Sequence, residues 1–257
     1  MFSVLYEDKD ILVAEKPAGL ESQSARSFAP DMVSEIRRHL STKLSTSSST
    51  ALFAGRPPYV GVIHRLDKPV SGVMVYALNQ KAAASLSSAL QSGKIEKHYL
   101  AVICGKPVDN QGVYVDYLLQ NRKNNTSSIV DKSVKDSKKC VLNYKTEQVI
   151  HREEQGEDRE FSLVDIELLT GRHHQIRVQF SGRGTPLYGD VRYGGEGCRE
   201  GGSGEGESAK RRSGERLEKK AGLALCAYRL AFPHPATGKR MEFSVKPSGG
   251  AFDWFNR

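Results

Sequence analysis

The sequence predicts an α+β fold built on a mixed, largely antiparallel β-sheet. Short apolar runs typical of strands recur along the chain, and two segments have the apolar spacing of helices. The expected strands come in groups and do not alternate strictly with helices, which favours α+β over a parallel α/β fold. A chain of 257 residues is long enough for one large domain or two small ones, and of these we adopt a single domain over residues 1–257.

The N-terminal part of the chain predicts a hairpin followed by a helix. Residues 4–6 and 11–14 are strand-like, and a turn-forming Asp-Lys-Asp joins them. Asp31 is a suitable N-cap for a short helix. Residues 41–50 are nearly all Ser and Thr, so we expect a flexible loop there.

The rest of the chain predicts further strands and two more helical segments. One helix begins after Asn79, a good N-cap, and ends near Gly93; the other covers residues 173–180. Residues 121–139 are polar and predict a loop or loose hairpin, and the Gly-rich, charged segment 196–220 predicts a disordered insert. Strands are expected at residues 59–63, 72–78, 95–104, 113–117, 141–149 and 161–169, with a last hairpin at 223–232 and 241–245.

The balance of charge favours an anionic partner. The formal net charge is +8 and the pI is about 9.3, as in many proteins that bind nucleic acid. No apolar run approaches the length of a membrane span, and the N-terminus has no export signal. We therefore expect a cytoplasmic protein that does not associate with a membrane. The cysteines form no CxxC pair, which argues against a zinc site, and we expect Cys104 and Cys226 to be reduced, buried thiols.

Asp67 stands out in the first of three polar clusters that interrupt the apolar elements. It lies between Arg65 and Lys68, and neighbouring cations keep a carboxylate ionised and available for chemistry. From the residues alone, a structural ion pair between Asp67 and an arginine is the simpler interpretation. The clusters are His64-Arg65-Leu66-Asp67-Lys68, Lys97-His98-Tyr99 and Gly171-Arg172-His173-His174-Gln175-Ile176-Arg177.

The other polar residues allow plainer interpretations as well. His173 and His174 are adjacent and cannot easily share a metal from a helix, and no HExxH spacing is present, so we expect no metal site. We expect both to make polar contacts at a helix start. Tyr99 suits core packing, and Arg172 with Arg177 suits either a solvated helix face or an anion site at the helix start.

Taken in order, these clusters resemble the motifs of the RluA family of RNA pseudouridine synthases. Val70 and Gln179 depart from the common pattern, where Thr and His are usual. The opening motif begins near residue 4, so we expect the S4 RNA-binding domain of many relatives to be absent. The matching segments are Leu5-Tyr6-Glu7-Asp8 with Val13 to Gly19, His64-Arg65-Leu66-Asp67 with Ser71-Gly72, Lys97 to Ala101, Thr170 to Arg177, and Pro186 to Asp190 with Tyr193-Gly194.

This resemblance implies a fold and a reaction. The family fold is a central, mainly antiparallel mixed sheet flanked by helices and loops, with a catalytic cleft across the sheet. The reaction breaks the C1′–N1 bond of a uridine in ribosomal or transfer RNA, turns the base and rejoins it through C5. Nothing is oxidised and nothing leaves, so the resemblance implies no cofactor, and we expect a monomer without an obligate protein partner.

The resemblance also implies roles for individual residues. Asp67 would be the catalytic carboxylate, with Arg172 holding it ionised and Tyr99 stacking on the target base. Arg65 would fill the gap left by the flipped uridine, and Ile176 would form an apolar wall behind the base. The substrate-binding set is completed by His64, Arg177 and Lys16.

Two other functions remain open at this point. A non-catalytic RNA-binding protein could use the same residues, although binding alone does not need an ionised carboxylate beside the base. A glycoside hydrolase could use Asp67 as nucleophile, but it needs a second carboxylate nearby. Asp165, Glu167 and Asp190 are the candidates for that partner.

Overall fold

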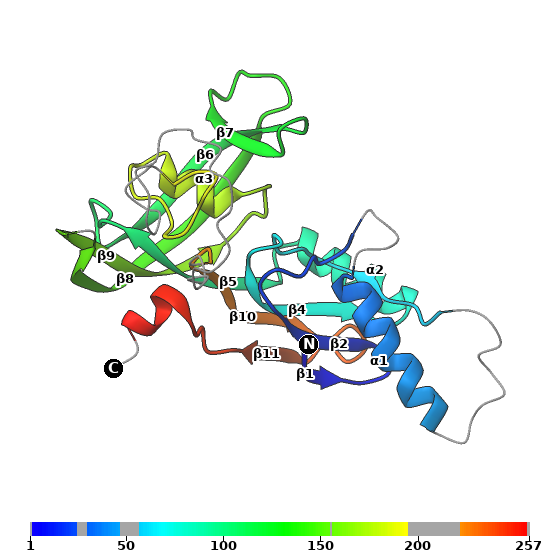
Figure 1. Cartoon of the computed structure of the whole chain (residues 1–257). Coiled ribbons are helices and arrows are strands. Elements are labelled where there is room, and N and C mark those ends of the chain that lie inside the picture. Colours follow the sequence, from blue (N-terminus) through cyan, green and yellow to red (C-terminus); the bar gives the residue numbers. More distant parts are fainter. Residues whose placement is uncertain (1, 25–29, 47–56, 155, 195–221, 256–257) are drawn as a thin grey trace. The chain divides into compact units, whose positions relative to one another are not determined.

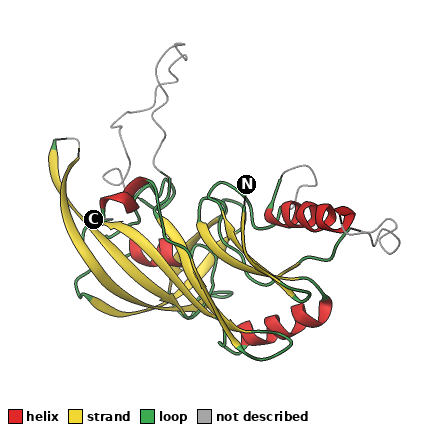
Figure 2. Cartoon of the chain, turned by 90° about the horizontal axis from the view of Figure 1, so that it is seen from below, coloured by secondary structure: helices red, strands yellow, loops and turns green. Residues whose placement is uncertain are grey.

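The computed structural model describes residues 2–24, 30–46, 57–154, 156–194 and 222–255 (Figure 1). The predicted disordered insert at 196–220 lies outside them. Strands dominate the described chain (Figure 2). They are β1 (Ser3–Glu7), β2 (Ile11–Lys16), β3 (Gly61–Val62), β4 (Ser71–Ala77), β5 (Glu96–Cys104), β6 (Gln111–Asn121), β7 (Thr126–Val130), β8 (Lys138–Glu154), β9 (Glu157–Leu168), β10 (Leu225–Pro233) and β11 (Arg240–Ser244). The helices are α1 (Met32–Thr46), α2 (Gln80–Gln91), α3 (Gln175–Ser181) and the 3-10 turn η2 (Gly250–Trp254).

The chain divides into two compact units. Unit 1 comprises Met1–Tyr99, Glu167–Leu169 and Cys226–Pro247, and unit 2 comprises Leu100–Ile166, Thr170–Leu225 and Ser248–Arg257. The backbone of β5, β9 and β10 passes from one unit to the other. A single catalytic domain over 1–257 therefore stays a prediction, as does the cleft across the sheet.

Unit 1 is a sheet with both faces buried around β2 and β4. Antiparallel pairs join β1 to β2 and β2 to β4, whereas β4 runs parallel to β10, so the sheet is mixed as predicted. One face packs against α2, whose buried side chains Ala82, Leu86 and Ala89 lie in a cluster with Ile11, Val13, Val73, Val75 and Phe232. On the other face Leu12 pairs with Tyr76 and Ala14 with Met74, all fully buried. Two apolar faces explain the continuous apolar runs of these strands.

Gly72 of the Ser71-Gly72 motif allows the parallel pair to form. Its φ is +130°, and a Cβ there would lie 2.3 Å from the carbonyl oxygen of Ala227, its register partner on β10. Glycine is therefore needed both for the backbone conformation and for the close approach of the strands. This contact fixes β4 directly after the loop that carries Asp67.

Unit 2 is an antiparallel sheet with α3 on one face. β6 pairs with both β7 and β8. The side chains that alternate toward α3 are buried, and Tyr114, Tyr144 and Phe180 form an aromatic group with ring centroids 4.4 to 5.9 Å apart. A second group joins η2 to the sheet, with Trp254 4.8 Å from Tyr188 and 5.1 Å from Phe161. These contacts hold α3 and the loop before it on the sheet.

Local signals predicted most elements correctly. The N-terminal hairpin forms, Asp31 accepts the Ser34 N–H at the start of α1, and Asn79 accepts the Ala82 N–H at the start of α2. Segment 121–139 supplies the turn and the second strand of the β6–β7 hairpin and then the turns before β8, so it contains both of the states predicted for it, hairpin and loop. The final hairpin forms between β10 and β11.

Two expectations are wrong. The loop predicted at 41–50 is helical up to Thr46, because α1 continues where Lys43 and His39 both bond to Glu7 of β1. Residues 47–50 lie outside the described chain. Cys226 is a buried free thiol as expected, but Cys104 is disulfide-bonded, and sequence position gave no sign of it. Among the described residues, no helix is both long and apolar enough to cross a membrane.

Candidate active site

Asp67 lies in the loop between β3 and β4 of unit 1. Its side chain is half-buried, that of Leu66 before it is buried, and that of Arg65 is exposed. The apolar residue therefore anchors the loop in the core, while the ionisable residues on either side face outward. This alternation lets the loop display a carboxylate without burying it completely.

Hydrogen bonds to backbone groups of the loop fix it on both sides of Asp67. The Ser22 hydroxyl accepts the Leu66 N–H at 3.0 Å and donates to the Leu66 carbonyl at 2.8 Å. After Asp67, the Lys68 carbonyl accepts the Gly19 N–H at 2.8 Å. The loop is thus held by the segment that follows β2, about 45 residues earlier in the chain. Such anchoring preorganises the position of the carboxylate.

Lys16, at the end of β2, also connects the segment after β2 with the Asp67 loop. Its side chain is fully buried, and its ammonium donates to the carbonyls of Leu20 at 2.6 Å, Pro17 at 2.9 Å and Lys68 at 3.2 Å. Burial lowers the pKa of Lys16 to about 8, and the negative charge of Asp67 partly offsets that effect. An ammonium has three donors, and all three are used within the protein.

Tyr99 belongs to the same electrostatic environment. It lies on β5 and is 6 % exposed. Burial raises the pKa of its phenol, and the negative charge of Asp67 raises it further, so the hydroxyl stays protonated at any physiological pH. Lys16, Asp67 and Tyr99, distant in sequence, are therefore brought together within unit 1.

His64 is held as a neutral imidazole. Its Nε2 accepts the Val75 N–H at 3.3 Å. Burial and the nearby charge of Lys97 lower the pKa of His64 to about 4. The hydrogen bond assigns the ring proton to Nδ1 and connects the catalytic-motif loop to β4.

Arg172 lies in unit 2, in the loop between β9 and α3, and its side chain is exposed. Its Nε donates to the Lys139 carbonyl at 3.0 Å, and its backbone N–H donates to Gln175 Oε1 at 3.0 Å. Because Asp67 and Arg172 belong to different units, their pairing stays a prediction.

A chain of hydrogen-bonded side-chain amides in α3, which begins at the Arg172 backbone, was not predicted from the sequence. Gln175 Oε1 also accepts the Thr170 hydroxyl, and its Nε2 donates to Gln179 Oε1 at 3.0 Å. Gln179, one of the two departures from the family pattern, is fully buried and donates to Asp116 at 2.7 Å. The departure itself was the only sequence signal, since side-chain amides in a helix carry no obvious chemical role.

Arg177 is a structural residue within unit 2. Its guanidinium donates twice to Asp190 at 2.7 Å, and the two residues are 5 % and 1 % exposed. Burial opposes ionisation of Asp190, but the bonds and charge of Arg177 together with the N–H groups of Arg192 and Tyr193 outweigh it, and the pKa of Asp190 lies below its ordinary value. Ile176 beside it is buried as well. A role for either in binding substrate stays a prediction.

His173 and His174 make polar contacts at the start of α3, as predicted. His173 bonds to the Ser127 hydroxyl at 2.9 Å and His174 to the Tyr193 hydroxyl at 2.7 Å. They precede the helix, and His174 has a left-handed backbone with φ of 55°, so the two rings stack with centroids 3.7 Å apart.

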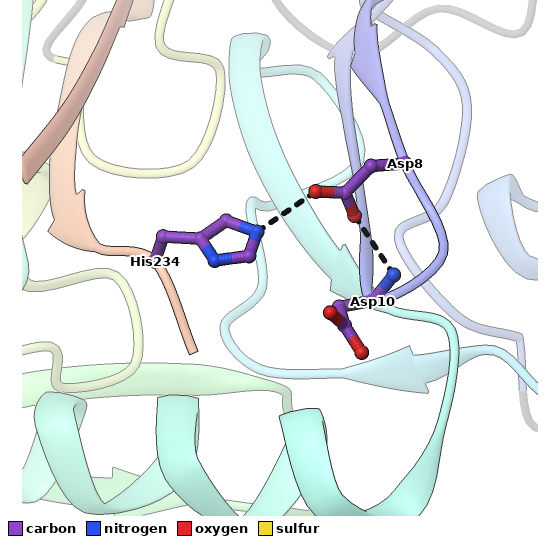
Figure 3. Close-up of side chains that lie close together, drawn as sticks. All are labelled: Asp8, Asp10 and His234. Carbon is purple, nitrogen blue, oxygen red and sulfur yellow. Dashed lines mark hydrogen bonds and ion pairs between the residues drawn. The ribbon is translucent and has the colours of Figure 1, made fainter. Parts of the chain in front are cut away.

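Asp8, Asp10 and His234 have the only spacing of metal-ligand atoms found within the described residues, all lying within 4.8 Å of one another (Figure 3). Their hydrogen bonds argue against an ion. His234 Nδ1 faces the N–H groups of Ala236 and Thr237, which assigns the ring proton to Nε2, and that nitrogen points at Asp8 at 2.8 Å. The other Asp8 oxygen accepts the N–H groups of Asp10 and Ile11. The cluster links two turns and does not fit a metal.

Comparison with known proteins identifies a consistent group of relatives. Residues 10–182 match the family described as RNA pseudouridylate synthase. The ribosomal large subunit pseudouridine synthase D of Zymomonas mobilis is 30% identical over 246 residues, which cover 95% of this chain and 68% of that protein. The RNA pseudouridine synthase YlyB of Bacillus subtilis is 31% identical over 243 residues, covering 94% and 68%.

Solved structures support the fold. Human RNA Pseudouridylate Synthase Domain Containing 1 superimposes with a TM-score of 0.68 at 21% identity, covering 96% of this chain and 84% of that one. Human RNA Pseudouridylate Synthase Domain Containing 4 gives a TM-score of 0.67 at 20% identity, covering 96% and 88%. At this identity the likeness concerns the fold alone.

Proposed function

The chain belongs to the RNA pseudouridine synthase family, whose activity is the isomerisation of uridine to pseudouridine in RNA, and from this we propose that Asp67 is its catalytic carboxylate. The observation that carries the proposal is the double anchoring of the Asp67 loop by Ser22 on one side and by Gly19 and Lys16 on the other. A purely structural ion pair does not need its backbone fixed so closely by a third segment.

The reaction sets the demands on the site. The C1′–N1 bond of uridine breaks, the base turns, and a C1′–C5 bond forms while the C5 proton is released and N1 takes up a proton. No electrons are exchanged with a redox partner, so the proposal includes neither a cofactor nor a metal. What the reaction needs is an ionised carboxylate beside the sugar–base junction and groups that hold the extruded base.

The proposed roles follow from the family motifs and from the chemistry of each side chain. Arg172 holds Asp67 ionised, Tyr99 contacts the target base through its protonated phenol, and Ile176 lies behind the base. Arg65, exposed next to the anchored loop, takes the place of the flipped nucleotide. His64 orients the same loop as a neutral hydrogen-bond acceptor.

We assign Lys16 and Arg177 supporting roles within this site. The three donors of Lys16 and the guanidinium of Arg177 are occupied by protein groups, so they position the Asp67 loop and α3 respectively. The large-subunit synthase of Zymomonas mobilis makes ribosomal RNA the first substrate to test, with transfer RNA second. We further propose a cytoplasmic monomer that needs no protein partner.

Release of tritium tests this function directly. RNA labelled with tritium at uridine C5, prepared from cells that lack this chain, should lose label to water when wild-type protein is added. Asp67→Asn should reduce release roughly 10⁴-fold or more while RNA binding persists. Asp109→Asn, at an exposed carboxylate in unit 2, is the matched control and should leave release unchanged. Full release by Asp67→Asn would disprove the assignment.

The products separate the two alternative functions. A glycoside hydrolase would yield free uracil and abasic RNA in place of pseudouridine, and either Asp165→Asn or Glu167→Gln would then abolish product. A binding protein would give no product, and Asp67→Asn would restore the phenotype of cells lacking the chain. Pseudouridine detected in the treated RNA rules out both.

A further inference from the structure

Residues 132–139 of unit 2 form a largely exposed, lysine-rich segment that runs from the turns after β7 into the first two residues of β8, here called the lysine loop. Lys132, Lys135, Lys138 and Lys139 are all exposed. Within the described residues, none of the four has an ion-pair partner, whereas Lys145 and Arg183 of the same unit pair with Glu147 and Asp116. Four lysines against one carboxylate, Asp136, within eight residues leave a local excess of positive charge that favours an anion.

The lysine loop has an ordered backbone. Asp131 Oδ1 accepts the Ser133 N–H at 2.8 Å, and successive turns form as Val134 N–H donates to Asp131 and Ser137 N–H donates to Val134. Its acidic residue, Asp136, has a left-handed backbone with φ of 64°. A loop folded into consecutive turns holds its lysines in place before any partner arrives, which lowers the entropy cost of binding.

The lysine loop is continuous with a residue of the proposed active site. Arg172 Nε donates to the Lys139 carbonyl, so the exposed guanidinium lies next to the end of the loop. Lys138 and Lys139 pair with Leu118 and Tyr117 of β6, which fixes this end on the sheet.

We propose that the lysine loop binds backbone phosphates of the RNA strand that flanks the target uridine. This inference rests on the proposed function and deepens it, because it names a surface that holds the substrate outside the reacting centre. Phosphates spaced along a strand suit a row of separate ammonium groups, each acting as a point charge. An RNA whose uridine reaches Arg172 passes the lysine loop on one side.

The salt dependence of RNA binding tests the proposal. The probes are a 20-nucleotide single-stranded oligouridine and ribosomal RNA from cells lacking the chain, and the protein carries Asp67→Asn to prevent turnover. A plot of the logarithm of the RNA association constant against the logarithm of the salt concentration has a negative slope. Replacing the four loop lysines with Gln should reduce the magnitude of that slope by about 3, because each lost contact to a single strand removes about 0.7. Thermal unfolding of the variant should match that of the parent, since no packing is lost.

A matched control separates position from net charge. Replacing the exposed lysines Lys9, Lys81, Lys94 and Lys239 of unit 1 with Gln removes the same charge and should change the slope by less than about 1. Equal slopes for the two variants would overturn the proposal. So would a loop variant that binds RNA normally but no longer binds vesicles containing anionic phosphatidylserine.

Failure of this inference differs from failure of the proposed function. If the wild-type protein releases no tritium from uridine C5 but the loop variant lowers the salt slope, the lysine loop binds RNA and the catalytic assignment is wrong. If tritium is released and the loop variant has the parent slope, the catalytic assignment stands and the lysine loop does not bind RNA.

Discussion

Asp67 and Asp190 are both aspartates in polar loops beside arginines, yet the structure treats them differently. Asp190 is 1 % exposed, accepts two bonds from Arg177 at 2.7 Å, and caps the following turn through Arg192 and Tyr193 N–H groups. Asp67 is half-buried, and the bonds that hold its loop involve its neighbours Leu66 and Lys68. The carboxylate of Asp190 is enclosed by its hydrogen-bond partners, whereas that of Asp67 remains partly exposed.

Of the variants that test this comparison, Asp190→Asn should lose the most stability. Neutralising Asp190 leaves the buried guanidinium of Arg177 without its counter-charge, which costs about 3–5 kcal/mol. Urea unfolding should therefore show a lower midpoint than in wild type with the same slope. Asp109→Asn serves as the exposed control and should unfold like wild type. A loss below about 1 kcal/mol would mean that this ion pair is not structural.

The second effect concerns Lys16 and depends on pH. Its pKa of about 8 in the folded chain lies below the ordinary 10.5, so between these values the unfolded chain binds more protons and stability rises with pH. Lys16→Met lacks this contribution. The difference in free energy of unfolding, wild type minus variant, should therefore increase by about 2 kcal/mol from pH 8 to pH 10.

An exposed lysine provides the control for that pH dependence. Lys9→Met should show a constant difference from wild type over the same range, because Lys9 is exposed in the turn between β1 and β2. Both variants remove one ammonium, so their comparison isolates burial. A pH-independent difference for Lys16→Met would show that the ammonium is not desolvated as its three carbonyl contacts imply.

The third effect tests whether anchoring of the Asp67 loop matters to chemistry. Ser22→Ala removes both bonds to Leu66 and should cost about 1–2 kcal/mol of stability. It should also lower kcat roughly tenfold with little change in KM, because the carboxylate loses its fixed position. Ser162→Ala removes a similar buried bond, to the Gly105 carbonyl in unit 2, and should cost stability without changing kcat. Equal effects on kcat would assign Ser22 to the fold alone.

The sequence predicted what is decided locally. The caps at Asp31 and Asn79 and the hairpin turn after Glu7 depend on neighbouring residues, and each appears where expected. The end of α1 was missed, because contacts of His39 and Lys43 with Glu7 extend it. Local polarity indicated a loop, and a tertiary ion pair overrode it.

The candidate site shows the same limit more sharply. Motif order pointed to Asp67, Tyr99 and Lys16, but nothing in the sequence says that Lys16 bonds three carbonyls or that Ser22 holds Leu66, since these contacts join residues up to 52 positions apart. Arg177 looked as suitable for substrate as Arg172. Only the bidentate contact with Asp190 distinguishes them.

The smallest effect on stability is expected at Asp67. It decides whether Asp67 is a structural ion-pair partner or a catalytic carboxylate, the two interpretations that the sequence left open. Asparagine keeps the size and one acceptor oxygen of the side chain, and the bonds of Ser22, Gly19 and Lys16 to the neighbouring backbone do not involve the carboxylate. The negative charge of Asp67 favours the charged form of buried Lys16, so Asp67→Asn should lower the free energy of unfolding by about 1 kcal/mol at most, less than Asp190→Asn in the same urea unfolding experiment. A loss of about 3 kcal/mol, like that expected for Asp190→Asn, would make Asp67 a structural ion-pair partner, because breaking such a pair strands a charge. A variant that loses no more than about 1 kcal/mol and is inactive toward uridine would instead show a carboxylate that the reaction requires far more than the fold does.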